Sequence, residues 1–227
     1  MRARSPTLRI GAEVYHQLKV TLEERGLDGG VGDEGGFAPE LESNKAPLEF
    51  LVSAIEAAGY RPGDDVAICL DPASSEFFHD GRYELACEGQ SLPSDQMIEL
   101  SSDIAERYAL RFLEDGLAES DWDGLKQPTD RLGDRLQSVD DDILVTNPGI
   151  LRQWSERGIA NSELITLNQI GTLTETLDAV AQARNAGYQR VISHRSGETE
   201  DTLSPTSPSR RASDRSRRAR RRAPSGS

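Results

Sequence analysis

Hydrophobic positions along the chain alternate between helix-like and strand-like segments. In residues 8–25, Val14, Leu18 and Leu22 recur at every fourth position, which is the spacing of one helix face. The unbroken apolar run at residues 66–70 has the length of a strand that is buried on both faces. The same alternation continues, which predicts helices at 8–25, 44–58, 94–108, 122–132, 148–157 and 174–185 and strands at 66–70, 110–113, 136–139, 164–167 and 190–192.

This order of elements indicates the fold class. Strands that alternate with helices are typical of right-handed β-α-β units built around a parallel sheet. We therefore predict an α/β protein. No GxGxxG or Walker A string follows any predicted strand, so a nucleotide-binding fold has no positive support.

Polar residues follow the predicted strands directly. Asp71 comes after Leu70, Glu114 after Leu113, and three aspartates follow the strand at 136–139. The carboxyl ends of parallel strands share one rim, where the active sites of β/α barrels lie. Carboxylates with no Cys or His ligand predict a site for Mg²⁺ rather than Zn²⁺. In the alternative interpretation, each acid only caps the helix that follows it.

Composition excludes two classes of protein. No run approaches the roughly 18 apolar residues of a membrane-spanning helix, and no apolar segment follows residues 1–6 as it would in a secretory signal. The only cysteines, Cys69 and Cys87, fit no metal-ligand spacing. We therefore expect a reduced, cytoplasmic setting, with Cys69 as a small core residue.

Residues 203–227 form a basic tail that differs from the rest of the chain. They hold eight arginines and one aspartate, a net charge of +7 within a chain of net charge −13, so residues 1–202 carry −20. The tail is rich in Ser, Pro and Arg and almost lacks apolar residues, so we expect it to be disordered. The acidic body is expected to repel nucleic acid and anionic lipid.

Six strings, in order along the chain, resemble the enolase family: GDEGGFAP (32–39), LDPASSEF (70–77), LEDGL (113–117), DDILVTNP (141–148), NQIGTLTET (168–176) and SHRSGETEDT (193–202). The resemblance covers residues 9–202 and leaves 1–8 as an irregular N-terminal segment. It implies a modified TIM-type barrel, homodimers and a need for Mg²⁺. The implied activity is phosphopyruvate hydratase, the glycolytic lyase that dehydrates 2-phosphoglycerate to phosphoenolpyruvate.

The same resemblance implies a role for each matching residue. Asp71, Glu114 and Asp141 match the three Mg²⁺ ligands, and Glu34 matches the general acid that assists loss of the hydroxyl. His194 matches a substrate-side histidine, and Arg195 and Ser196 match the residues that hold the phosphate. Without the family, Glu34 is better explained as a solvated carboxylate in a glycine-rich loop.

The chain departs from the family at its general base. The family has a lysine in a string like LIKVNQIGTLTET, and this chain has Thr166 at that position. A threonine hydroxyl cannot remove a carbon-bound proton near neutral pH, and loss of a positioned base commonly lowers the rate about 10²–10⁴-fold. Glu163 also places a carboxylate where the family's strand is apolar, which is costly if the charge is buried and unpaired.

Parts of the family's fold have no counterpart in this sequence. They are the N-terminal α+β domain, the first barrel strands, and the last strands with an IKTG-like string. A barrel of about 250 residues is therefore expected to be incomplete. A one-base shift in GC-rich codons for residues 204–220 can give a string close to the family's continuation, which is the basis for a hypothesis that the tail is a frameshift product.

Three functions are compatible with these observations. The first is Mg²⁺-dependent phosphopyruvate hydratase activity, severely impaired by Thr166. The second is an inactive remnant of a degraded or frameshifted gene that still binds Mg²⁺ weakly. The third is nucleic-acid binding through the arginines of the tail, which is the least supported because the tail has no aromatic residues to stack on bases.

Overall fold

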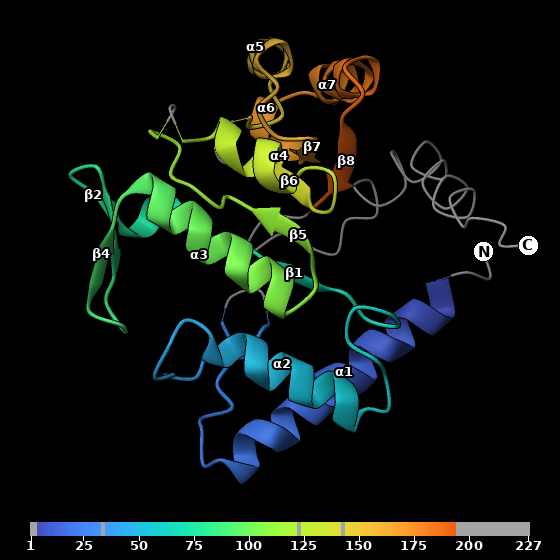
Figure 1. The fold of residues 1–227 in the computed structure, drawn as a ribbon. Helices are drawn as coiled ribbons and strands as arrows, with labels where there is room; N and C mark the ends of the chain where they lie inside the picture. The colour runs from blue at the N-terminus through green and yellow to red at the C-terminus, as the bar shows by residue number, and fades with distance from the viewer. Residues whose placement is uncertain (1–3, 33–34, 122–123, 142–143, 194–227) are drawn as a thin grey trace, which may run out of the picture. The chain divides into compact units, whose positions relative to one another are not determined.

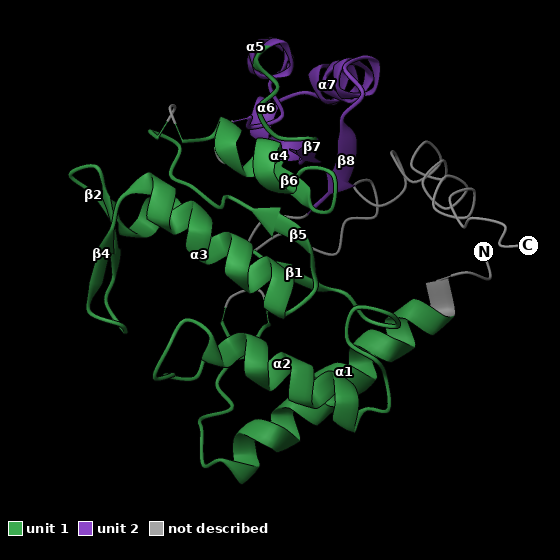
Figure 2. Cartoon of the chain, in the orientation of Figure 1, with its two compact units in different colours: residues 1–139, 157–161 green, residues 140–156, 162–227 purple. Residues whose placement is uncertain are grey.

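The computed structural model describes four stretches of the chain, residues 4–32, 35–121, 124–141 and 144–193 (Figure 1). The basic tail at residues 203–227 and the boundary at Thr202 lie outside them. The chain divides into two compact units (Figure 2). Unit 1 comprises residues 1–139 and 157–161, and unit 2 comprises residues 140–156 and 162–227.

Two helices open unit 1 and pack against each other. Helix α1 spans Arg4–Glu24 and α2 spans Ala46–Ala57. Because α1 begins at Arg4, residues 4–8 are helical rather than irregular. The chain leaves α1 through Gly26, which has a φ of +72°, a left-handed conformation that glycine adopts without steric cost.

Three parallel strands form the centre of unit 1: β1 at Ile68–Leu70, β5 at Leu110–Glu114 and β6 at Gln137–Asp140. Helices α3, at Ser94–Arg107, and α4, at Lys126–Leu132, occupy the connections between them. Helix α4 begins four residues later than the hydrophobic pattern predicted. The core of this unit consists of Val14, Leu48, Ala54, Ile55, Ile68, Ile104, Tyr108, Leu110, Leu113, Leu132 and Leu136.

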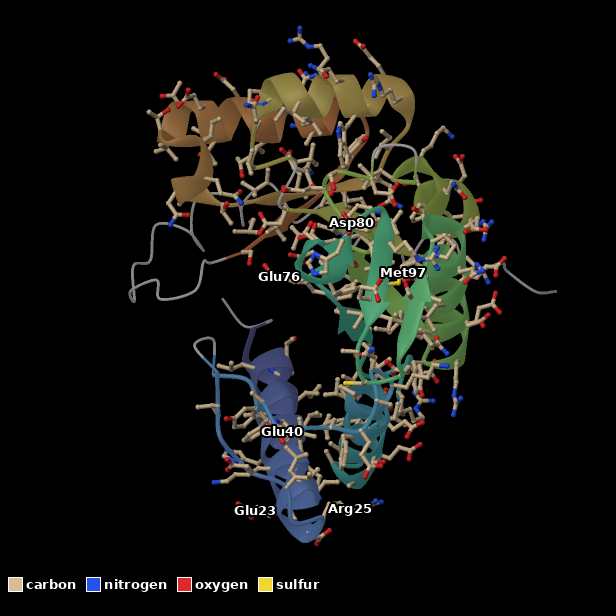
Figure 3. All side chains as sticks on the ribbon, turned by 90° about the vertical axis from the view of Figure 1, so that its left-hand side faces the viewer. Glu23, Arg25, Glu40, Glu76, Asp80 and Met97 are labelled. Atoms are coloured by element: carbon tan, nitrogen blue, oxygen red, sulfur yellow. The ribbon has the colours of Figure 1, made fainter. Side chains whose placement is uncertain are left out.

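A small antiparallel sheet lies in the connection between β1 and α3. Its strands are β2 at Phe78–His79, β3 at Arg82–Leu85 and β4 at Gln90–Leu92, in that order, after the 3-10 helix η1 at Ser74–Phe77. Asp80 and Gly81 form the first turn with φ of +49° and +78°, the conformation of a two-residue hairpin. Met97 of α3 lies beside this sheet (Figure 3).

Unit 2 consists of a parallel strand pair with helices. Strands β7, at Ser162–Ile165, and β8, at Gln189–Ile192, pair in parallel, and α7, at Leu173–Asn185, packs against both. Helix α5 spans Pro148–Arg157, and the short α6 spans Leu167–Ile170. Trp154 of α5 is 1% exposed and therefore belongs to the buried interior.

Strand β7 begins and ends two residues earlier than predicted. The apolar run predicts a strand at 164–167, whereas the strand contains Ser162 and Glu163, and Thr166 follows its end. The described residues contain five parallel strands, β1, β5, β6, β7 and β8. A closed β/α barrel has eight, so the prediction of an α/β fold with an incomplete barrel is confirmed.

Candidate functional site

Asp71 and Glu114 lie at the carboxyl ends of two neighbouring strands. Leu70 of β1 and Leu113 of β5 are register partners, and each acid is the next residue along its strand. The two carboxylates therefore come directly after two residues that pair with each other in the parallel sheet. The N–H of Ala73 donates to Asp71 Oδ1 at 2.9 Å, which turns the chain immediately after β1.

Cys69 lies on the same face of the sheet as these acids. Cys69 pairs with Phe112, and these two residues lie two positions before Asp71 and Glu114 on their respective strands. Cys69 is exposed, so the prediction that it is a core residue is wrong. Its neighbour Ile68 is 3% exposed and faces the core, and successive side chains of a strand point to opposite faces. Partial burial of the thiol, and then the charge of Glu114, raise the pKa of Cys69.

The loops that follow β1 and β5 are joined by hydrogen bonds. The N–H of Ser74 donates to the carbonyl oxygen of Asp115 at 3.2 Å. The N–H of Glu119 donates to the hydroxyl of Ser75 at 3.1 Å. Asp115 has a φ of +41°, an uncommon conformation for a non-glycine residue that the surrounding contacts must hold. Asp71 and Glu114 therefore precede two loops that are fixed to each other.

In unit 2, a hydrogen-bond network connects Asp141 to Thr166, the residue predicted to stand at the position of the family's base. The side-chain amide of Gln169 donates to Asp141 Oδ1 at 2.5 Å, and Gln169 Oε1 accepts from the hydroxyl of Thr146 at 2.9 Å. The same Thr146 oxygen accepts from the backbone N–H of Thr166 at 3.1 Å. Thr146 is fully buried with a φ of +57°. The network thus fixes the backbone at the end of β7.

Thr166 supplies no basic group at this position. Its side chain is 1% exposed, and within the described residues its hydroxyl has no hydrogen-bond partner. An unpartnered alcohol is a far weaker base than the amine of a lysine, and it has no neighbour here that accepts its proton. Thr166 therefore cannot take a proton from a ligand at this position.

Glu163 is buried in β7, as the departure from the family's apolar pattern implied. Its relative exposure is 0%, and burial raises its pKa to about 8, while Arg190 opposes the shift. At neutral pH the carboxyl is therefore mostly protonated and uncharged. This corrects the expectation of a buried charge, since burial of the neutral acid avoids much of the desolvation cost.

Carboxylate oxygens are the donors that Mg²⁺ prefers, and the neighbouring positions of Asp71 and Glu114 fit that ion. Within the residues that the structure describes, no group of three or more His, Cys, Asp or Glu side chains is gathered as a metal site. The three-carboxylate site with Asp141 therefore stays a prediction. Four other predicted site residues, Glu34, His194, Arg195 and Ser196, lie outside the described residues.

A family comparison decides the ancestry of this fold. The family model for the enolase C-terminal TIM barrel domain matches residues 2–206 of the chain. The chain belongs to the enolase family. The resemblance predicted from six short strings is thereby confirmed for the partial C-terminal domain. None of the helices described here is long and apolar enough to cross a membrane.

Three residues that bind to the predicted site residues or to their loops were not identified from the sequence: Tyr83 in unit 1, and Thr146 and Gln169 in unit 2. Thr146 and Gln169 lie within the strings that resemble the enolase family, so the resemblance was a usable signal for them. Tyr83 belongs to the hairpin, for which the Asp80-Gly81 dipeptide was the available signal.

Proposed function

We propose that this enolase-family chain is a catalytically inactive relative of phosphopyruvate hydratase that retains carboxylates for Mg²⁺ and has lost proton abstraction. The proposal depends on one observation above all. At the end of β7, where the family has its lysine base, the chain has Thr166, which is buried and has no partner for its hydroxyl among the described residues.

The reaction of the family explains why this position is decisive. Dehydration of 2-phosphoglycerate requires removal of a proton from the carbon next to the carboxylate, which is a weak acid. The charged groups can bind the substrate, but without a base of suitable pKa the first step has no proton acceptor. Binding and turnover are therefore separated in this chain.

We assign Mg²⁺ binding to Asp71, Glu114 and Asp141. Two of them follow register partners on adjacent strands, and the third accepts a hydrogen bond from Gln169, which orients its carboxylate. When bound, Mg²⁺ offsets the negative charge of the substrate carboxylate. Glu34 would act near the leaving hydroxyl, and His194, Arg195 and Ser196 would hold the phosphate. The cytoplasmic setting and the homodimer are part of the same proposal.

The test combines an activity assay with metal titration of the purified full chain. Absorbance at the wavelength of phosphoenolpyruvate is followed with 2-phosphoglycerate and Mg²⁺, and we expect no rate above that without protein. In calorimetric titration, Asp71→Asn and Glu114→Gln should each weaken Mg²⁺ binding at least about tenfold. Asp134→Asn, which removes an exposed carboxylate, serves as the matched control.

Two results would contradict the proposal. Turnover at an ordinary enzymatic rate would show that another group replaces the lysine, and the first alternative, an active hydratase, would hold. Equal Mg²⁺ affinity for Asp71→Asn, Glu114→Gln and Asp134→Asn would show that the strand-end acids do not bind the ion.

A further inference from the structure

Tyr83 connects the hairpin to the loop that follows Glu114. Its hydroxyl donates to Asp121 Oδ2 at 2.8 Å and accepts from the backbone N–H of Ala118 at 3.0 Å. The side chain is 0% exposed. A buried hydroxyl that both donates and accepts fixes two points of the same loop at once.

The tyrosine ring is itself held in place by the hairpin. Tyr83 pairs with Phe78 of β2 and with Leu92 of β4. Its ring centroid lies 4.6 Å from that of Phe78 and 6.0 Å from that of Phe77 in η1. These contacts leave the hydroxyl little freedom to follow a moving loop. Figure 3 labels Glu76 of η1 and Asp80 of the hairpin turn beside this region.

Asp121 receives further donors that fix its carboxylate. The hydroxyl of Ser94, the first residue of α3, donates to Asp121 Oδ2 at 2.5 Å, and the N–H of Gly124 donates to Oδ1 at 3.2 Å. A Cβ at Gly124 would come within 2.8 Å of Asp121 Oδ2, so any other residue at position 124 would displace this carboxylate. The carboxylate therefore has one well-defined position.

The same loop is also bound by the segment after Asp71. Ser74 donates to the carbonyl oxygen of Asp115, and Ser75 accepts from Glu119. Residues 115–121 are thus held between the segment after β1 and the buried tyrosine. Glu114 is the residue immediately before this fixed loop, and Asp71 lies shortly before the serines.

We infer that Tyr83 is a positioning residue for the metal-binding carboxylates: its hydroxyl fixes the loop 115–121 and through it the orientation of Glu114 relative to Asp71. The consequence for Mg²⁺ rests on the proposed function, whereas the hold on the loop does not. Partners that orient a metal ligand without touching the metal commonly change metal affinity about 10–100-fold when they are lost.

The experiment compares Tyr83→Phe with Tyr108→Phe in the full chain. Tyr108 is a matched control, because it is also buried in unit 1 and its hydroxyl donates to a carboxylate, that of Glu49. Amide hydrogen exchange is read for residues 115–121 without metal, and Mg²⁺ affinity is read by calorimetric titration. Asp121→Asn, which alters the acceptor and leaves the ring, serves as a second variant if Tyr83→Phe fails to fold.

For Tyr83→Phe, exchange at the amide of Ala118 should rise about tenfold, because its acceptor is lost, and Mg²⁺ binding should weaken about tenfold. Tyr108→Phe should change neither. Unchanged exchange in 115–121, or faster exchange with unchanged Mg²⁺ affinity, would overturn the inference. If the wild-type chain binds no Mg²⁺, the proposed metal site is wrong and the inference about Glu114 is wrong with it. The exchange result alone still decides whether Tyr83 holds the loop 115–121.

Discussion

Glu163 of β7 lies directly opposite Arg190 of β8 in the parallel ladder, and yet neither carboxyl oxygen has a hydrogen-bond partner among the described residues. The carboxyl is fully buried, whereas Arg190 is only half-buried. Burial, and then the charge of Glu163, raise the pKa of Tyr188, which precedes β8. The structure therefore accommodates Glu163 best as a neutral acid.

This arrangement predicts that stability decreases with increasing pH. The carboxyl has a pKa of 4.5 in its ordinary state and about 8 in the fold. Between these values the folded chain retains a proton that the unfolded chain releases. The stabilisation is therefore complete below pH 4.5 and falls by up to about 1.4 kcal/mol per pH unit until pH 8.

Thermal unfolding measured from pH 5 to pH 9 checks this prediction. Glu163→Gln should flatten the pH dependence, and Glu163→Leu should also raise Tm, because an apolar side chain replaces an unsatisfied acid. Glu156→Gln removes an exposed carboxylate from the same unit and should behave like the wild type. An equal slope in Glu163→Gln and the wild type would contradict the pKa assignment.

Two buried threonines should differ in their response to substitution by valine. Thr146→Val removes the acceptor for the N–H of Thr166 and the donor to Gln169, so the free energy of unfolding should fall by about 1–3 kcal/mol. Thr166→Val removes a hydroxyl without a partner in the described structure and should change stability little or increase it. Urea denaturation of both variants measures the difference, and equal losses would refute the network.

The alkylation rate of Cys69 should depend on the charge of Glu114. The carboxylate helps to raise the pKa of the thiol, and only the thiolate reacts with alkylating agents. Glu114→Gln should therefore speed alkylation of Cys69 at pH 8 by about two- to threefold. Mass spectrometry measures the rate, with the exposed Cys87 as an internal reference. No change relative to Cys87 would show that the two groups are not neighbours.

Much of the fold could be predicted because its strands are short apolar runs that end in polar residues. Asp71 and Glu114 were identifiable for that reason, and the parallel register places them on adjacent strand ends. The predicted position of strand β7 was two residues too late, because Glu163 interrupts the apolar pattern. Only tertiary burial makes a glutamate at position 163 compatible with a strand.

The hydrogen-bond partners of the predicted site residues and of their loops could not be predicted from the sequence. Gln169 and Thr146 are 23 residues apart and meet only through the fold. Tyr83 and Asp121 are 38 residues apart and belong to a hairpin and a loop. Hydrogen bonds between such distant residues leave no periodic trace in a single sequence, since periodicity reflects which residues share a face.

Exchange of the carbon-bound proton of 2-phosphoglycerate in D₂O tests the central claim most directly. This exchange needs a base but does not need loss of the hydroxyl, so it separates proton abstraction from the rest of the reaction. With Mg²⁺ and the full chain, proton NMR should show no exchange above the rate without protein, because Thr166 cannot accept the proton. Exchange at an enzymatic rate would contradict the account: loss of that exchange in Thr166→Val would make Thr166 the base, and its persistence would assign the base to another group.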